Sequence, residues 1–246
     1  MPSRVVHFEA SGKDANKLRD FYSNVFGWSF NVMPEMDYGL VDNGGKGING
    51  GIGGVGDAPS GSAPFYVAVD DPQATLDKAE KLGGKTTMPV MEIPNIVTLA
   101  QFTDLDGNLI GIVKDDPTMT PPPSTAPPAK NPVTWFEITG KDAGKVRDFY
   151  SQLFGWKYNM MDDYAMVEGD EHGSGGGLGA AQGDAHAIWY VEVADPQATL
   201  DKIASSGGKI VMPATDIGIV TFGIFNDPEG NRVGVFKGGD QQANGN

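Results

Sequence analysis

A short segment near the start of the chain alternates apolar and polar side chains and carries two groups that can move protons. In Val5-Val6-His7-Phe8-Glu9-Ala10 the period of two places His7 and Glu9 on one face of a predicted strand, opposite Val6 and Phe8. Imidazole is a candidate general base because its ordinary pKa lies near neutrality, and a neighbouring carboxylate suits acid–base chemistry. A structural role, in which both side chains only hydrogen-bond to their surroundings, remains open.

The same arrangement recurs in the second half of the chain with different chemistry. Trp135 and Glu137 stand where His7 and Glu9 stand in the first half, so a flat aromatic surface replaces a titratable group. Later strands add Tyr66 and Asp70 to the first face, and Tyr190 to the second. Glu192, which matches a neutral Ala68, favours a cation or a hydrogen-bond donor. The candidates are therefore His7, Glu9 and Tyr66 for catalysis, and Trp135, Glu137, Tyr190 and Glu192 for binding a planar ligand.

Residue usage limits the other kinds of site. The chain has no cysteine, which excludes disulfides, thiolate nucleophiles and cysteine-bound metals. Its 3 histidines are His7, His172 in a charged turn and His186 just before a strand. We expect His172 to be solvated and His186 to lie at the rim of the second site. Residues 44–56 are rich in glycine, but no Lys-Ser/Thr pair or helix follows, so a loosened strand is favoured over a phosphate-binding loop.

Four helices are predicted to position these strands. The helices predicted at residues 14–27 and 142–155 begin with an Asp and end with a Gly. Each carries the pattern FYS…FG followed directly by a Trp, at a spacing of 128 residues (149 − 21). Their aromatic side chains are predicted to be core. Residues 71–78 and 195–202 are identical and begin with Asp-Pro, the favoured order at a helix start. Strands around each helix complete a strand, helix, strand, strand, strand pattern that occurs four times.

The chain divides into two similar halves at a proline-rich stretch. We predict domains at residues 1–114 and 133–237, a semi-rigid linker at 115–132 and a flexible tail at 238–246. The fold class is α+β, with tandem βαβββ units. The repeated FY…FGW and D-x-x-G-N segments, the latter at 104–108 and 227–231, are similar to those of the vicinal oxygen chelate superfamily, and the chain looks most like its two-domain glyoxalase-like proteins of the actinobacterial type.

The resemblance implies an eight-stranded curved mixed sheet around a cleft in each domain, and it implies where metal ligands would lie. The superfamily's first ligand position is His7 in one domain and Trp135 in the other. Its glutamate position holds Gly111 and Gly234, and its middle-strand position holds Pro64 and Ile188. Because these residues cannot complete a ligand set, we expect no metal and no cofactor.

Two functions remain open on these grounds. One is a protein that sequesters a small organic molecule, as the superfamily's bleomycin-resistance members do. The other is a metal-independent lyase or isomerase that uses a carboxylate, His7 or a tyrosine as acid–base group. The net charge of −14 argues against nucleic acid and anionic membranes as partners. No membrane span or signal peptide is evident, so a cytoplasmic protein is expected, and it could be a monomer because the chain already pairs four units.

Overall fold

The computed structural model describes residues 3–54, 61, 63–116, 126–168 and 174–238. The first half contains β1 (Val5–Gly12), α1 (Ala15–Phe26), β2 (Asn31–Met33), the 3-10 turn η1 (Pro34–Met36), β3 (Tyr38–Val41), β4 (Asn49–Gly54), β5 (Phe65–Val69), α2 (Pro72–Lys81), β6 (Lys85–Ile93), β7 (Val97–Thr103) and β8 (Leu109–Lys114). The second half contains β9 (Val133–Gly140), α3 (Ala143–Phe154), β10 (Tyr158–Met161), β11 (Tyr164–Val167), β12 (Gly175–Ala180), β13 (His186–Glu192), α4 (Pro196–Ser205), β14 (Lys209–Asp216), β15 (Val220–Asn226) and β16 (Arg232–Gly238). The predicted α+β class is confirmed.

Each half of the chain forms one mixed sheet of 8 strands, in the orders β2-β3-β4-β1-β5-β8-β7-β6 and β10-β11-β12-β9-β13-β16-β15-β14. The sheets are mixed because hairpin neighbours such as β7 and β8 are antiparallel, whereas β5 and β8 are parallel. The two strand orders are equivalent position by position. The predicted doubling of βαβββ units, two for each eight-stranded sheet, is therefore confirmed.

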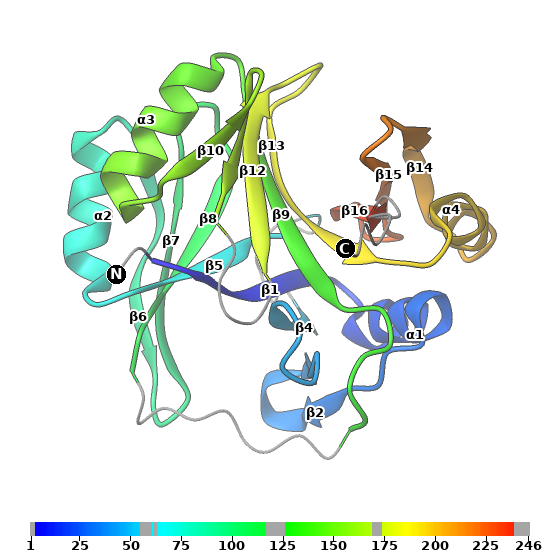
Figure 1. Cartoon of the computed structure of the whole chain (residues 1–246). Helices are drawn as coiled ribbons and strands as arrows, with labels where there is room; N and C mark the ends of the chain where they lie inside the picture. Colours follow the sequence, from blue (N-terminus) through cyan, green and yellow to red (C-terminus); the bar gives the residue numbers. More distant parts are fainter. Residues whose placement is uncertain (1–2, 55–60, 62, 117–125, 169–173, 239–246) are drawn as a thin grey trace, which may run out of the picture. The chain divides into compact units, whose positions relative to one another are not determined.

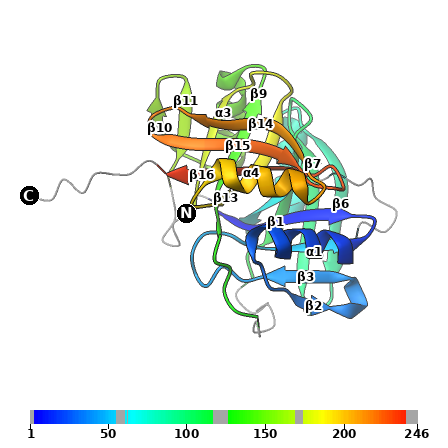
Figure 2. The ribbon, with the colours of Figure 1, turned by 90° about the vertical axis from the view of Figure 1, so that its right-hand side faces the viewer.

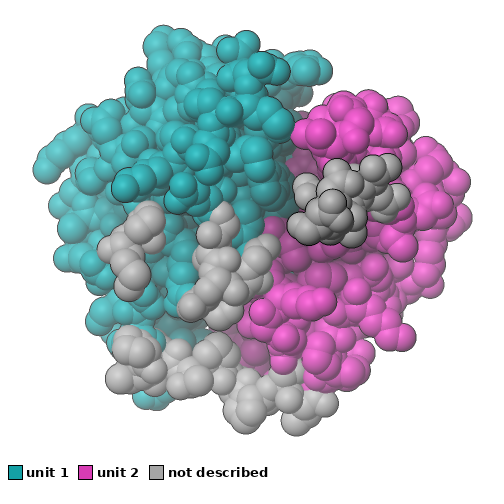
Figure 3. Space-filling model, in the orientation of Figure 1, with its two compact units in different colours: residues 1–8, 64–125, 135–188 teal, residues 9–63, 126–134, 189–246 magenta. Residues whose placement is uncertain are grey.

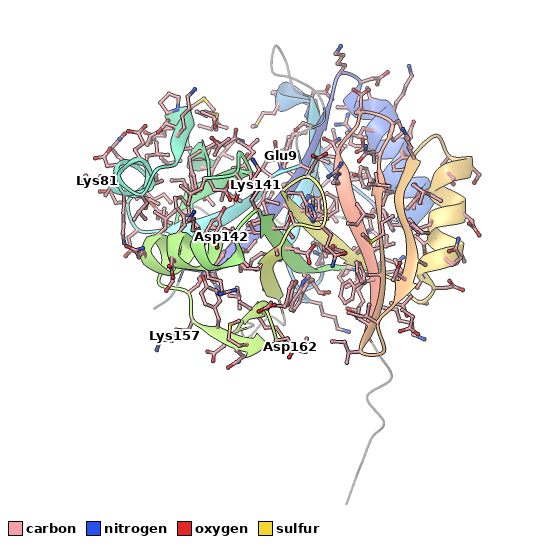
Figure 4. The ribbon with its side chains drawn as sticks, turned by 90° about the horizontal axis from the view of Figure 1, so that it is seen from above. Glu9, Lys81, Lys141, Asp142, Lys157 and Asp162 are labelled. Atoms are coloured by element: carbon pink, nitrogen blue, oxygen red, sulfur yellow. The ribbon has the colours of Figure 1, made fainter. Side chains whose placement is uncertain are left out.

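The helices begin and end where the sequence predicts. Asp14 and Asp142 accept hydrogen bonds from the backbone amides of Lys17 and Lys145, and Figure 4 shows Asp142 at the start of α3. Gly27 and Gly155 end α1 and α3 at φ 71° and 72°, a left-handed conformation that glycine adopts without strain. Strand β2, which follows α1, begins at Asn31, and Trp28 between the two elements is buried in the core.

The chain's compact units do not follow its two halves. Unit 1 comprises residues 1–8, 64–125 and 135–188, and unit 2 comprises residues 9–63, 126–134 and 189–246 (Figure 3). Each unit thus takes elements from both halves of the sequence. The boundaries at 114 and 133 separate the two sheets, and independent folding of residues 1–114 and 133–237 stays a prediction.

In unit 1, α2 and α3 lie side by side (Figure 1). Tyr150 of α3 donates a hydrogen bond of 2.9 Å to Asp104, which precedes β8. The same carboxylate accepts bonds from the backbone and side-chain amides of Asn108, both at 2.9 Å, and so closes the D-x-x-G-N turn. Asn108 in turn donates to the carbonyl of Thr139 in β9. A motif of the first half is therefore bonded to a helix and a strand of the second.

Unit 2 contains the reciprocal arrangement. Tyr22 of α1 donates a hydrogen bond of 2.9 Å to Asp227, and Asn231 donates to the carbonyl of Ser11. Burial and the nearby Asp227 raise the pKa of Tyr22 well above its usual value, so its proton stays in place. Tyr22 also stacks on Trp28 with ring centroids 5.4 Å apart, and α4 packs over β15 (Figure 2). The predicted core role of the FY…FGW aromatics is confirmed by their burial.

The predicted linker and the predicted tail lie only partly within the described residues. Within the predicted linker, residues 117–125 lie outside the described part, but Asn131 bonds the carbonyl of Phe26, and Trp28 Nε1 donates to the carbonyl of Asn131. The end of the linker therefore packs against α1. Of the predicted tail, Gly238 is the last residue of β16, and residues 239–246 lie outside the described part.

Candidate functional site

Glu137 is the centre of a hydrogen-bonded cluster within unit 1. Strand β9 turns Trp135, Glu137 and Thr139 to one face, because alternate side chains point the same way, while Phe136 and Ile138 are buried. Tyr164 Oη of β11 donates to Glu137 Oε1 at 3.0 Å, and His186 Nε2 of β13 lies 3.1 Å from Glu137 Oε2. We call Trp135, Glu137, Thr139, Tyr164 and His186 the Glu137 cluster.

The Glu137 cluster is partly exposed to solvent, and its side chains contact one another. The side chains of His186 and Glu137 are 16% and 17% exposed, so each keeps a surface that a small molecule can touch. The side chain of Trp135 hydrogen-bonds with Tyr164. Burial, and secondly the Glu137 charge, raise the pKa of Tyr164 far above its usual range, which keeps the phenol neutral.

The glycines of β12 make room for the two aromatic rings of the cluster. A Cβ at Gly177 would meet the Tyr164 hydroxyl at 1.9 Å, and a Cβ at Gly175 would meet the Trp135 ring at 2.8 Å. Any larger residue at Gly177 would push the Tyr164 ring away. The glycine-rich strand therefore provides the space in which these aromatic rings lie, and the same holds for β4, where a Cβ at Gly51 would clash with the ring of Tyr38. The prediction of a glycine-loosened strand in 44–56 is confirmed for β4.

His186 is held from both sides of its ring. Its Nδ1 lies 3.2 Å from Thr139 Oγ1 and 3.3 Å from the carbonyl of Asp184, and its backbone amide donates to Thr139 Oγ1. His186 was predicted to lie at the rim of the second site, and its parity along β13 is that of Tyr190. Tyr164 was not predicted as a site residue, but each half carries a tyrosine, Tyr38 or Tyr164, ahead of a glycine run.

Glu9 has a related but different setting in unit 2. Ser11 donates to Glu9 Oε1 at 2.9 Å, and Tyr38 donates to Oε2 at 3.4 Å. Tyr38 matches Tyr164, but the position of His186 corresponds to Ser62, which lies outside the described residues. Among the partners that lie in the described part of the chain, each of the two matched carboxylates has a tyrosine, and the second partner is Ser11 for Glu9 and His186 for Glu137.

His7 and Tyr66 lie together in unit 1. Their ring centroids are 5.8 Å apart, edge to face, and Gln101 donates a hydrogen bond of 2.8 Å to the Tyr66 hydroxyl. Burial lowers the pKa of His7 to about 4, so the expectation of a pKa near neutrality is wrong. A general base at neutral pH needs a proton affinity that this imidazole lacks. His172 lies outside the described residues, and Asp70 is exposed just after β5.

Tyr190 and Glu192, the remaining candidates, lie in unit 2. Tyr190 is buried, 3% exposed, with its ring edge-on to Phe236 at 6.3 Å between centroids. Glu192 is exposed and accepts a hydrogen bond of 3.3 Å from Thr134. The structure therefore brings Trp135 and Glu137 together in one unit and Tyr190 and Glu192 together in the other.

The residues at the expected ligand positions do not fit the superfamily's metal. Tyr66 pairs with Gly111 and Tyr190 pairs with Gly234 on neighbouring parallel strands. A Cβ at Gly111 would lie 2.2 Å from the Tyr66 ring, and one at Gly234 would lie 2.0 Å from the Tyr190 ring. The tyrosine rings thus occupy the space that a carboxylate side chain would need. Among the described residues no group of three or more His, Asp or Glu side chains is placed to hold a metal ion.

Comparisons with known proteins agree with this architecture. Residues 4–112 and 133–235 match the model of the family described as Glyoxalase/Bleomycin resistance protein/Dioxygenase superfamily. The "Putative glyoxylase CFP32" of Mycobacterium tuberculosis is 25% identical over 244 residues, which cover 93% of this chain and 92% of that protein. The "Anthracycline biosynthesis protein DnrV" of Streptomyces peucetius is 28% identical over 127 residues, covering 43% of this chain and 46% of that protein. The 2,3-dioxygenase LapB from Pseudomonas sp. KL28 has a TM-score of 0.62 at 15% identity, covering 96% of this chain and 92% of its own, which shows a shared fold.

Proposed function

Since the chain belongs to the Glyoxalase/Bleomycin resistance protein/Dioxygenase superfamily, we propose that it binds a small organic molecule at the Glu137 cluster, in sequestration or resistance. Binding takes place without the metal that the superfamily's enzymes use, because tyrosine rings fill the carboxylate positions at Gly111 and Gly234. Tyr66 and Tyr190 then act as packing residues.

The observation that carries this proposal is the pairing of aromatic surface with a fixed carboxylate. The rings of Trp135 and Tyr164 pack against the glycines of β12, and a hydrogen bond links the two side chains. Their positions are therefore fixed in the absence of a ligand, which lowers the entropic cost of binding. Glu137 supplies one oriented acceptor beside them. A mostly apolar surface with few polar groups in fixed places is the usual composition of a small-molecule site.

A planar aromatic molecule is the ligand shape that this surface suits. Indole and phenol rings gain most from offset or edge-to-face contact with another ring. The Streptomyces peucetius relative is named for anthracycline biosynthesis, and anthracyclines are planar aromatic compounds. This supports an anthracycline as the first probe.

The test is a fluorescence titration with daunorubicin. We expect saturable binding and a loss of about tenfold in affinity in Trp135→Ala, the size that removal of one aromatic contact gives. His7→Ala, at the matched position of the other half, is the control and should keep the affinity. Absence of saturable binding to daunorubicin and to smaller planar probes, or equal affinity in Trp135→Ala, would refute the proposal.

The metal-free character has a separate test. Elemental analysis of the purified protein should find Zn, Ni, Mn and Fe well below one ion per chain, and dialysis against a chelator should leave daunorubicin affinity unchanged. About one tightly held ion per domain would contradict this, and its ligands would then have to include Glu9 or Glu137.

A metal-independent lyase or isomerase is the second candidate function. The contact between His186 and Glu137 favours it, since a histidine–carboxylate pair can pass a proton to and from a bound molecule. Turnover of adducts of α-oxoaldehydes with thiols, measured with and without added metal, tests this candidate. A rate above background that disappears in His186→Gln and persists without metal would support it.

A further inference from the structure

We infer that the D-x-x-G-N turn at residues 104–108 positions the Glu137 cluster, and that Asn108 is a positioning residue for ligand binding. The turn belongs to the first half of the chain and the cluster to the second, but both lie in unit 1. The expected effect on ligand affinity rests on the proposed function, whereas the positioning of His186 stands on the contacts alone.

Buried hydrogen bonds hold the turn in place. Asp104 is 7% exposed and accepts bonds of 2.9 Å from the hydroxyl of Tyr150 and from the backbone and side-chain amides of Asn108. Asn108 is 5% exposed, and Tyr150 is fully buried. Because a buried polar group that loses its partner is costly, the turn resists displacement.

Two hydrogen bonds join the turn to the end of β9. Asn108 Nδ2 donates to the carbonyl of Thr139 at 3.0 Å, and the backbone amide of Lys141 donates to Asp106 Oδ2 at 3.2 Å. Gly140 lies between the two bonded residues, and a Cβ at this position would clash with the Asp106 carboxylate. The glycine therefore allows the turn to approach the strand closely.

The bonded end of β9 carries the side chain that holds His186. Thr139 Oγ1 accepts a hydrogen bond of 3.1 Å from the backbone amide of His186 and lies 3.2 Å from its Nδ1. His186 Nε2 in turn lies 3.1 Å from Glu137 Oε2. A displacement of Thr139 therefore alters the contact between His186 and Glu137.

Unit 2 contains the same bonding pattern around Glu9. Asn231 Nδ2 donates to the carbonyl of Ser11, and the backbone amide of Lys13 donates to Glu229 Oε2, both at 3.0 Å. Ser11 lies two residues after Glu9, as Thr139 does after Glu137, and it donates to Glu9 Oε1 at 2.9 Å. The recurrence of these bonds with different side chains indicates that each turn positions the surroundings of the matched carboxylate in its unit.

The experiment compares Asn108→Ala in the full-length protein with its matched control, Asn231→Ala. Each variant removes the bonds of one buried side-chain amide, so both should lower the urea midpoint of unfolding. Only Asn108→Ala should move the imidazole signal of His186 in the NMR spectrum of histidine-labelled protein at one fixed pH, assigned with His186→Gln. Only Asn108→Ala should weaken daunorubicin binding, by about fivefold, a size typical of residues that are coupled to a site without touching the ligand.

A second pair of variants keeps the test valid if Asn108→Ala does not fold. Tyr150→Phe removes a bond that holds Asp104, and Tyr22→Phe removes the matched bond to Asp227 in unit 2. Tyr150→Phe should move the His186 signal and weaken daunorubicin binding, and Tyr22→Phe should change neither.

The outcomes separate this inference from the proposed function. An unchanged His186 signal in Asn108→Ala and Tyr150→Phe, or equal changes in both members of each pair, would refute positioning by the turn while the binding site stands. A His186 signal that moves without a change in affinity would refute the role of Asn108 in binding. If the wild type does not bind daunorubicin saturably, the effect on affinity fails with the proposed function, and the His186 signal alone decides whether the turn positions the cluster.

Discussion

At the scale of single residues, the most informative side chain is His7, because it stands where the superfamily resemblance places a metal ligand and is instead packed as a neutral group. Burial lowers its pKa to about 4, and the Tyr66 ring lies edge to face with the imidazole at 5.8 Å between centroids. An imidazole that is hard to protonate makes a poor acid–base catalyst at neutral pH. His7 is therefore a half-buried side chain that stays neutral at pH 7.

This environment predicts a specific dependence of stability on pH. The folded-state pKa of His7 lies below the unfolded value near 6.5, so below that value the unfolded state binds more protons than the folded state. Stability is full above about pH 6.5 and falls as the pH drops toward 4, by about 1–3 kcal/mol from this residue. Urea unfolding of wild type and His7→Gln at pH 7 and pH 4.5 measures it.

Carboxylates also titrate in this window, so the change in unfolding free energy between the two pH values is compared in the wild type and in His7→Gln. The loss of unfolding free energy between the two pH values should be smaller in His7→Gln than in the wild type. Equal losses would show that His7 is protonated in the folded state.

At the scale of elements, the glycine-rich strands determine where the aromatic rings of the neighbouring strands lie. Strand β12 lets Tyr164 lie flat and reach Glu137, and β4 does the same for Tyr38 and Glu9. The neighbouring strand β10, between Lys157 and Asp162, forms the hairpin that presents Tyr164 (Figure 4). The identity of the β12 residues thus determines the position of a side chain on the neighbouring strand β11.

Gly177→Ala tests this dependence. The new Cβ would lie 1.9 Å from the Tyr164 hydroxyl, so the ring must move and its bond to Glu137 is lost. We expect a loss of about 1–3 kcal/mol in unfolding free energy, typical of overpacking, together with weaker daunorubicin binding. Gly183→Ala is the matched control, since nothing lies within 4 Å of its Cβ and it should change neither quantity. Unchanged stability and binding in Gly177→Ala would contradict the assignment.

Sequence reasoning reached the elements well and the site only in part. Caps at Asp14 and Asp142, breaks at Gly27 and Gly155 and the paired strands are local signals, and the structure confirms them. The partners of Glu137 come from β11 and β13, which are far from β9 in sequence and are aligned only by the sheet. The low pKa of His7 depends on packing that no spacing rule contains.

At the scale of the whole molecule, the two halves exchange partners. Tyr22 of the first half bonds Asp227 of the second, and Tyr150 of the second bonds Asp104 of the first. The FY and D-x-x-G-N motifs, predicted separately from the sequence, are the two sides of these bonds. Each half carries one FY motif and one D-x-x-G-N motif, so the sequence allows a bond between the two motifs of the same half equally well. The bonds between motifs of different halves could therefore not be predicted. Among the residues that the structure describes, no helix has the length and apolar character that crossing a bilayer would need.

This exchange predicts how separated halves behave. Residues 1–116 and 126–246, produced as two chains and mixed, should associate and elute together, because each compact unit needs elements of both. Tyr22→Phe combined with Tyr150→Phe removes both exchanged bonds and should weaken the association about tenfold or more. Size-exclusion chromatography and cooperative unfolding measure the result. Two halves that each unfold cooperatively as monomers and do not associate would confirm the division at 114 and 133 as one between independent domains.

The reciprocal tyrosine–aspartate bonds have a consequence for assembly. Because donor and acceptor belong to one chain, each encounter is intramolecular, and its effective concentration does not depend on the concentration of the protein. Dilution therefore does not take the partners apart, as it would for two separate half-sized chains. The two copies are also free to accumulate different residues, since neither has to be self-complementary. His7 beside Tyr66 and Trp135 beside Tyr164 show this freedom: one duplicated position holds a half-buried imidazole, and the other holds an aromatic ring next to the contact between His186 and Glu137.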